Sequence, residues 1–190
     1  MNSSLLKKAL PHIIAVVVFL VVSIVYCKPV LQGKALLQSD VVQYNGMAQQ
    51  SKEFREKHGH LPLWTESAFS GMPAYTIMME PSSVINIGYL HYVFTLGLPK
   101  PINFFFLACV CFYFLAMVLG INPWIGILSA LAYSYCSYDP ELVATGHDTK
   151  ILAIGYAPAV IASLLLIYQR RYFWGGLLLA IFFSQQLIIT

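Results

Sequence analysis

The feature that most constrains the fold of this chain is a series of long apolar runs separated by short polar segments. The first run, from Leu10 to Tyr26, would be about 25 Å long as an α-helix, which is enough to cross a thin bilayer core. Hydrophobic residues make up 58% of the chain and charged residues only 10%, so a water-soluble fold would lack the polar surface it needs. The sequence therefore predicts an all-α, polytopic membrane protein.

Charge and cysteine content narrow the classes of function. The net charge is only +3 and the basic residues are scattered, which argues against nucleic acid as a partner. The four cysteines lie in or beside apolar runs, where cysteine usually packs as a small hydrophobic residue. No small-residue cleavage site follows the first apolar run, so we interpret it as an uncleaved first span and not as a signal peptide.

The apolar runs predict about five transmembrane helices in a single membrane domain. We place the spans at 10–27, 101–119, 121–138, 151–168 and 172–190, with a long extracytoplasmic loop at 28–100 that carries interfacial helices and a short one at 139–150. Pro123 suits the first turn of the third helix, and Pro158 predicts a kink in the fourth. The last run has no closing polar flank, so we expect this chain to be the N-terminal portion of a longer protein, inactive alone.

The positions of the basic residues predict the topology. The positive-inside rule places both the lysine pair at 7–8 and the arginine pair at 170–171 in the cytoplasm, which requires an even number of crossings between them. Four spans satisfy this condition, whereas counting the short apolar segment 84–98 as a further span does not. We therefore interpret 84–98 as an interfacial helix, capped by Ser82 or Ser83, and expect a cytoplasmic N-terminus.

Asp40 is a carboxylate that lies shortly after the first apolar run. The pattern from Ser39 to Gln43 is an N-cap signal and predicts a helix that continues to His58. On pattern alone, a capping role is favoured over a chemical one. In the functional interpretation, an acid held just above the bilayer acts as a general base for a hydroxyl acceptor or as a metal ligand. One carboxylate does not distinguish these roles.

The segment 60–78 mixes aromatic residues with prolines and a glycine, so it is predicted to be a loop and not one helix. Trp64, Phe69 and Tyr75 could stack against a sugar, although aromatic residues at headgroup level are more often interfacial anchors. Glu66 is a second carboxylate, in principle within reach of Asp40, although a solvated loop acid is the favoured interpretation. Trp64 and Glu66 are therefore candidate substrate-binding residues.

The stretch from Gly146 to Lys150 leads directly into the fourth predicted span. Free N–H groups at a helix start, the positive end of the helix dipole, a histidine and a lysine together make an anion site, for which phosphate is the natural occupant. His147, Asp148 and Lys150 are its candidate residues. In the alternative interpretation Asp148 or Thr149 caps the helix and Lys150 extends to the membrane interface, which leaves His147 unexplained.

Four stretches together resemble the YfhO-like family of bacterial multi-pass membrane proteins, which is placed among the GT-C type glycosyltransferases. They are LQSDVVQYNGM, LPLWTESAFSGMPAY, ALAYSYCSY and ATGHDTKILAIGYAP, in that order and over nearly the whole chain. The chains of that family are several times longer, so this sequence would correspond to their N-terminal part. The resemblance implies an enzyme of the bacterial cytoplasmic (inner) membrane that uses a polyprenyl-phosphate-linked sugar on the extracytoplasmic face.

The resemblance also implies a role for Asp40. In GT-C enzymes an aspartate in the first external loop serves as the catalytic base or helps to hold a metal ion, and Asp40 stands in that place. A second, adjacent acid is common in the family, but position 41 is valine, which favours a single base over a metal-bridging pair. No residue is assigned as a metal ligand, and the need for a divalent metal ion stays open.

The expected function is inverting transfer of the sugar to an extracytoplasmic acceptor, a glycan or a lipid, with Asp40 as the base. His147, Lys150 and the helix start would offset the charge that develops on the departing phosphate, and we expect them close to Asp40. The alternatives are a membrane transporter or lipid flippase, or a non-catalytic membrane subunit. A transporter should carry ionisable groups at bilayer depth, whereas here they gather at the predicted outer rim, Asp139 and Glu141 among them.

Overall fold

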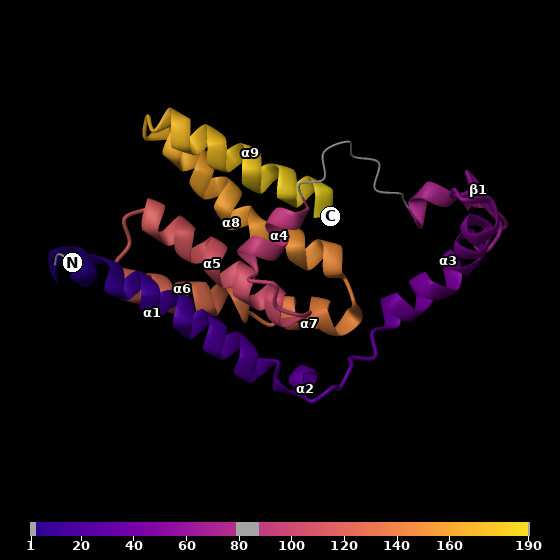
Figure 1. The fold of residues 1–190 in the computed structure, drawn as a ribbon, viewed down its shortest axis with the longest axis horizontal. Helices are drawn as coiled ribbons and strands as arrows, with labels where there is room; N and C mark the ends of the chain where they lie inside the picture. The colour runs from indigo at the N-terminus through magenta and orange to yellow at the C-terminus, as the bar shows by residue number, and fades with distance from the viewer. Residues whose placement is uncertain (1–2, 79–87, 190) are drawn as a thin grey trace. The chain divides into compact units, whose positions relative to one another are not determined.

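The computed structural model describes residues 3–78 and 88–189, and most of these residues are helical (Figure 1). The chain divides into two compact units. The first comprises residues Met1–Ala35, Ile87–Val143 and His147–Thr190, and we name it the bundle. The second comprises Leu36–Asn86 and Ala144–Gly146, and we name it the polar unit. The predicted helical class is confirmed, with one two-stranded hairpin in addition.

The apolar runs form the helices of the bundle. These are α1 (Ser3–Tyr26), α2 (Lys28–Leu31), α4 (Tyr89–Phe94), α5 (Ile102–Val118), α6 (Pro123–Ser134), α7 (Tyr138–Thr145, whose last two residues belong to the polar unit), α8 (Asp148–Tyr168) and α9 (Tyr172–Ile189). By length and composition, α1 and α8 could each cross a membrane, while α5, α6 and α9 are shorter apolar helices. These two helices support association with a membrane.

The structure differs from the sequence-based boundaries around the third predicted span. The helix predicted for 121–138 ends at Ser134, and the segment 139–150, predicted as a loop, contains most of α7. The start of α7 is rich in helix-initiating residues, because acids in a first turn complement the helix dipole and proline is tolerated there. Within the predicted interfacial segment, α4 is one short helix; the proposed caps Ser82 and Ser83 lie outside the described residues.

Side-chain contacts show which helix ends lie together within the bundle. At one end, the ring of Tyr26 packs against those of Phe105 and Tyr135, with centroid distances of 5.1 and 5.0 Å, so the end of α1 lies beside the start of α5 and the end of α6. At the other end, Gln169 Nε2 donates to the carbonyl of Val118 at 3.1 Å, which joins the ends of α8 and α5. Consecutive long helices of the bundle therefore alternate in direction.

Pro158 lies inside α8 without ending the helix. A proline has no N–H, so the carbonyl of Ile154, four residues earlier, loses its helical donor. The hydroxyl of Tyr133 on α6 donates to this carbonyl at 2.9 Å, and Gln186 Nε2 on α9 donates to the neighbouring carbonyl of Ala153 at 2.9 Å. Adjacent helices thus satisfy the backbone around the proline, as proline in an apolar helix requires. The kink stays a prediction.

The close approach of α9 to α8 depends on a turn and a glycine. Arg170 has a left-handed backbone (φ 63°), its N–H bonds to Ile167, and the N–H of Arg171 bonds to Leu166, which is the Schellman pattern that ends a helix. One turn into α9, a Cβ at Gly175 would lie 2.6 Å from Ile167 Cγ1 and 2.8 Å from its backbone nitrogen. Only glycine fits at this crossing.

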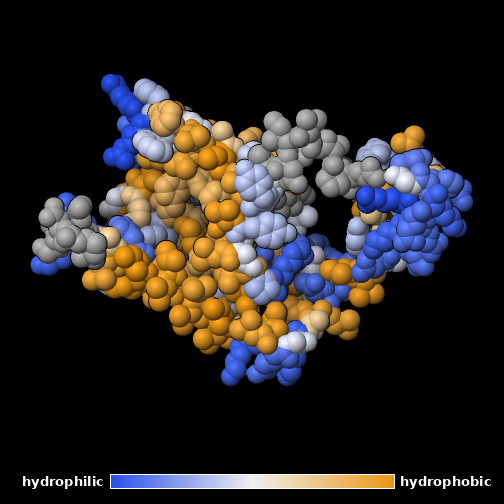
Figure 2. Space-filling model, viewed as in Figure 1, coloured by the Kyte–Doolittle hydropathy of each residue, from blue (hydrophilic) through white to orange (hydrophobic). Residues whose placement is uncertain are grey.

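The polar unit contains α3 (Ser39–His58), the strands β1 (Trp64–Thr65) and β2 (Met72–Pro73), and a 3₁₀ helix η1 (Ala74–Thr76). The helix predicted from Ser39 to His58 is confirmed. Gln50 Oε1 on α3 accepts hydrogen bonds from Thr65 Oγ1 at 2.7 Å and from the N–H of Glu66 at 2.9 Å, which attach the hairpin to the helix. Figure 2 shows hydrophilic residues over most of α3, and hydrophobic residues over most of the bundle.

Candidate functional site

Asp40 lies in the first turn of α3 and is half-buried. The prediction that it belongs to the N-cap is wrong in position, because Gln38 is the N-cap residue and makes no side-chain capping bond. Ser39 Oγ donates to Asp40 Oδ1 at 3.2 Å. A carboxylate in a first turn is stabilised by the positive end of the helix dipole. Asp40 is therefore a first-turn acid and not the N-cap residue.

Gly146 also belongs to the polar unit and lies against the same turn of α3. A Cβ at Gly146, whose φ is +99°, would be 3.0 Å from Gln38 Cβ and 3.0 Å from Val41 Cγ2. A residue with a side chain would be strained here both by the backbone conformation and by the contact. Within the polar unit, the backbone of Gly146 thus packs against the first turn of α3.

The start of α8 is built by residues from two segments of the bundle. His147 is the N-cap residue but makes no side-chain capping bond, so the predicted cap at Asp148 or Thr149 is wrong. Asp148 instead forms an ion pair with Lys100, with 2.6 Å between Nζ and Oδ2. Lys150 Nζ lies 5.2 Å from the centroid of the Tyr138 ring. Two lysines and one carboxylate therefore flank this helix start.

His91 on α4 extends this cluster into the bundle. Its Nδ1 lies 2.9 Å from the hydroxyl of the fully buried Tyr156 on α8. Burial, and the positive charge of Lys100, lower the pKa of His91. Sequence reasoning missed both His91 and Lys100 as site residues, because their partners lie 65 and 48 positions away in the chain. The one sequence feature that could have identified these two residues is that each is polar and lies beside an apolar segment.

Asp139 lies in α7, and the sequence suggested that it was a loop charge without a function. Only 2% of Asp139 is exposed, in the first turn of α7, and burial raises its pKa to about 6. A buried carboxylate is not the loop charge that the sequence suggested.

Trp64 and Glu66 lie in the same unit as Asp40 but not beside it. The N–H of Glu66 bonds to Gln50, ten residues beyond Asp40 and therefore about 15 Å further along α3. Glu66 is therefore not beside Asp40, and its exposed position agrees with the interpretation favoured from the sequence, a solvated loop acid. The indole of Trp64 packs on Gly71, where a Cβ would come within 2.7 Å of Nε1, and more than half of Trp64 is exposed. These residues form a separate exposed surface of the polar unit.

Metal-ligating side chains were searched for in the part of the chain that the structure describes. Across 3–78 and 88–189, no three or more His, Cys, Asp or Glu side chains come together in a way that could hold one. Asp40 is followed by Val41 and Val42, which offer no further ligand.

Comparisons of the chain with models of protein families, with curated proteins and with solved structures found no match.

Proposed function

We propose that this chain belongs to a membrane glycosyltransferase of the GT-C type, similar to the YfhO-like family, that transfers a sugar from a polyprenyl-phosphate donor to an extracytoplasmic acceptor. The observation that carries the proposal is the cationic start of α8, where Lys100 is held by Asp148 and Lys150 lies two residues further on. A helix start with added cations is suited to a phosphate group. The motif that contains Asp40 supplies the acid such a reaction needs.

The proposed topology has α1, α5, α6, α8 and α9 crossing the inner membrane of a bacterium. Support comes from their alternating directions, which put the lysine pair at 7–8 and the arginine pair at 170–171 at the same end of the bundle. The positive-inside rule then assigns that end to the cytoplasm. α6 has only 12 residues, about 18 Å of helix, so we propose that the bilayer thins locally around it.

In the proposed mechanism, Asp40 takes the proton of the acceptor hydroxyl while the oxygen attacks the anomeric carbon. The bond between that carbon and the lipid phosphate breaks on the opposite face, so the configuration inverts and the phosphate leaves with the bonding electron pair. Lys100, Lys150 and the first N–H groups of α8 offset the negative charge that develops. Asp148 contributes indirectly, since it holds Lys100 in place until the phosphate competes for it.

The test is transfer activity of Asp40→Asn in the full-length protein, with Glu53→Gln on the exposed surface of α3 as the matched control. A general base contributes about 10²- to 10⁴-fold, so we expect kcat to fall by that factor while the donor Kd stays within about twofold. Glu53→Gln, which replaces an acid paired only within the helix with Gln49, should retain full activity. Normal transfer by Asp40→Asn would exclude Asp40 as the base.

A second experiment tests whether Lys100 contacts the phosphate of the donor. Lys100→Met should weaken donor binding about tenfold, because one charge-assisted contact is lost. Lys57→Met, an exposed lysine at the end of α3, is the control for loss of charge alone. Equal donor affinity in the two variants would contradict the assignment.

A further inference from the structure

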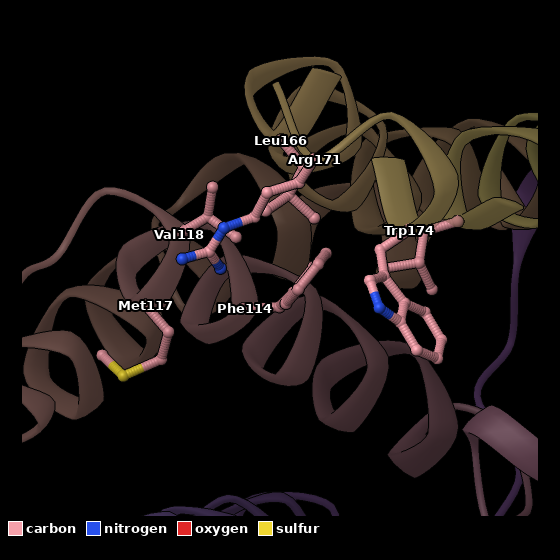
Figure 3. Close-up of a pocket in the computed structure, with 7 residues that line it drawn as sticks. Phe114, Met117, Val118, Leu166, Arg171 and Trp174 are labelled. Carbon is pink, nitrogen blue, oxygen red and sulfur yellow. The ribbon is translucent and has the colours of Figure 1, made fainter. Parts of the chain in front are cut away.

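An apolar groove of about 330 Å³ lies at the end of the bundle opposite Lys100, where α5 and α8 end and α9 begins (Figure 3). Phe114 and Val118 of α5 and Leu166 of α8 contribute to its apolar lining, and Arg171 and Trp174 supply its polar atoms. The volume is at the lower end of the range, roughly 300–1,000 Å³, of sites for small ligands. The groove thus combines apolar walls with one cation and one indole.

The turn between α8 and α9 fixes Arg171 at this groove. Its N–H closes the Schellman turn on Leu166, and its carbonyl accepts the N–H of Gly175, so the backbone of Arg171 is held at both ends. Figure 3 shows the guanidinium extending toward Val118, above the apolar wall. Among the residues that the structure describes, its side chain has no hydrogen bond or ion pair. The guanidinium is therefore available to an anion from outside the chain.

We propose that this groove binds an anionic phospholipid of the leaflet at the Arg171 end of the bundle. The phosphate contacts the guanidinium of Arg171, the indole of Trp174 lies at the level of the glycerol backbone, and the first part of one acyl chain fills the apolar groove. Basic pockets between membrane helices bind anionic headgroups, and tryptophan prefers the headgroup region. A soluble phosphate would match the charge but would leave the apolar wall uncovered.

This inference rests on the proposed membrane topology but not on the proposed chemistry. Its readout is lipid binding and involves no sugar transfer. If the protein proves not to transfer sugars, lipid binding at the groove can still hold. If the groove proves not to bind lipid, the catalytic role proposed for Asp40 is unchanged.

The test is native mass spectrometry of the full-length protein in micelles that contain equal amounts of phosphatidylglycerol and phosphatidylcholine. One basic group near anionic lipid changes binding by about fivefold, so we expect the bound phosphatidylglycerol to exceed phosphatidylcholine by about that factor. Arg171→Gln should bring the ratio near one, and Arg171→Lys should keep most of it. Arg170→Gln is the matched control, because Arg170 is the neighbouring cation but does not line the groove.

A second variant pair tests the apolar part of the site. Leu178→Trp fills the groove and should lower the occupancy of both lipids severalfold, whereas Leu177→Trp, one position away and outside the lining, should not. Helical content by circular dichroism checks that each variant folds.

Three results would overturn the proposal. If Arg170→Gln and Arg171→Gln lower the ratio of bound phosphatidylglycerol to phosphatidylcholine equally, the preference comes from the general positive charge of this end and not from the groove. Unchanged lipid occupancy in Leu178→Trp would place the acyl chain elsewhere, for instance because another protein segment covers the groove. Complete displacement of the lipid by millimolar inorganic phosphate would show a site for a free anion.

Discussion

α3 of the polar unit and α5 of the bundle are helices of similar length with opposite surroundings. α3 buries only Ala48 and Ser51, whereas most of α5 is buried. The hairpin is attached to α3 by side-chain hydrogen bonds, while the bundle is held by apolar packing and by hydrogen bonds to carbonyls that lack a helical donor. The stability of the bundle should therefore depend mainly on close packing, whereas the stability of the polar unit should depend on a few side-chain hydrogen bonds.

The largest expected effect is at the crossing of α8 and α9. Gly175→Ala places a methyl group within 2.8 Å of the backbone of Ile167, so α9 must move away; we expect a loss of about 3 kcal/mol in unfolding free energy. Gly176→Ala is the matched control, because nothing lies within 4 Å of its Cβ, and it should be neutral or slightly stabilising. Denaturant titration in detergent measures both. Equal stability of the two variants would refute the packing interpretation.

Substitution of Asp139 measures how much free energy of folding the bundle loses by burying a charged carboxylate. The folded protein binds a proton on Asp139 up to about pH 6, whereas the unfolded chain releases it near 3.8, so stability falls as the pH rises between these values and then stays low. Asp139→Asn removes this penalty and should raise the unfolding free energy by about 3 kcal/mol at pH 7.5. Below pH 3.8 the gain should vanish.

Parallel titrations of Asp139→Asn and the unmodified protein at pH 7.5 and pH 3.5 decide the point. An equal gain at both values would show that the effect is not electrostatic. Glu56→Gln, an exposed acid on α3, serves as the control and should change stability by less than about 0.5 kcal/mol, roughly the limit for surface substitutions.

Tyr133 and Pro158 test whether neighbouring helices satisfy the α8 backbone. Tyr133→Phe leaves the Ile154 carbonyl without its donor and should cost about 1–2 kcal/mol. In a Pro158→Ala background the helix supplies an N–H to that carbonyl, so Tyr133→Phe should cost less than half as much. A double-mutant cycle measures the coupling. Additive effects would mean that the hydroxyl does not replace the missing donor.

The smallest expected effect is in the polar unit. Gln50→Ala removes both hydrogen bonds to the hairpin and should lower its local stability by about 1 kcal/mol. Hydrogen exchange should therefore become faster at residues 60–78 and stay unchanged in α5. Gln49→Ala, whose side chain bonds only to Glu53 on the same helix, is the control. Faster exchange in α5 as well would show that the two units do not open independently.

The sequence predicted the helices well where a long apolar run or a clear stop signal exists. The predicted spans at 101–119 and 172–190 agree closely with α5 and α9, and Gly59, with its positive φ, ends α3 where expected. It failed at α7, because an eight-residue helix carries too few residues for a recognisable apolar period. The attachment of the hairpin to α3 at Gln50 was also not predicted, because sequence spacing does not report where a hairpin attaches.

The candidate site was predicted only in part. Pattern alone made Asp40 and the start of α8 candidates, because polar residues beside apolar runs are conspicuous, whereas the catalytic role of Asp40 came from the family resemblance and stays a prediction. It missed Lys100 and His91, and it gave Asp148 a capping or phosphate role where the structure shows an ion pair. Distant partners of this kind follow from helix packing and not from local pattern.

The sequence by itself determined that this protein forms apolar helices and where α1 and α8 end, because each apolar run stops at a polar or basic segment. Only the tertiary structure decided which side chains complete another helix's hydrogen bonds, such as Tyr133 at Ile154. The physical reason is that a pairing depends on the rotation and register of two packed helices, and both are set by contacts such as that at Gly175 and not by either helix alone.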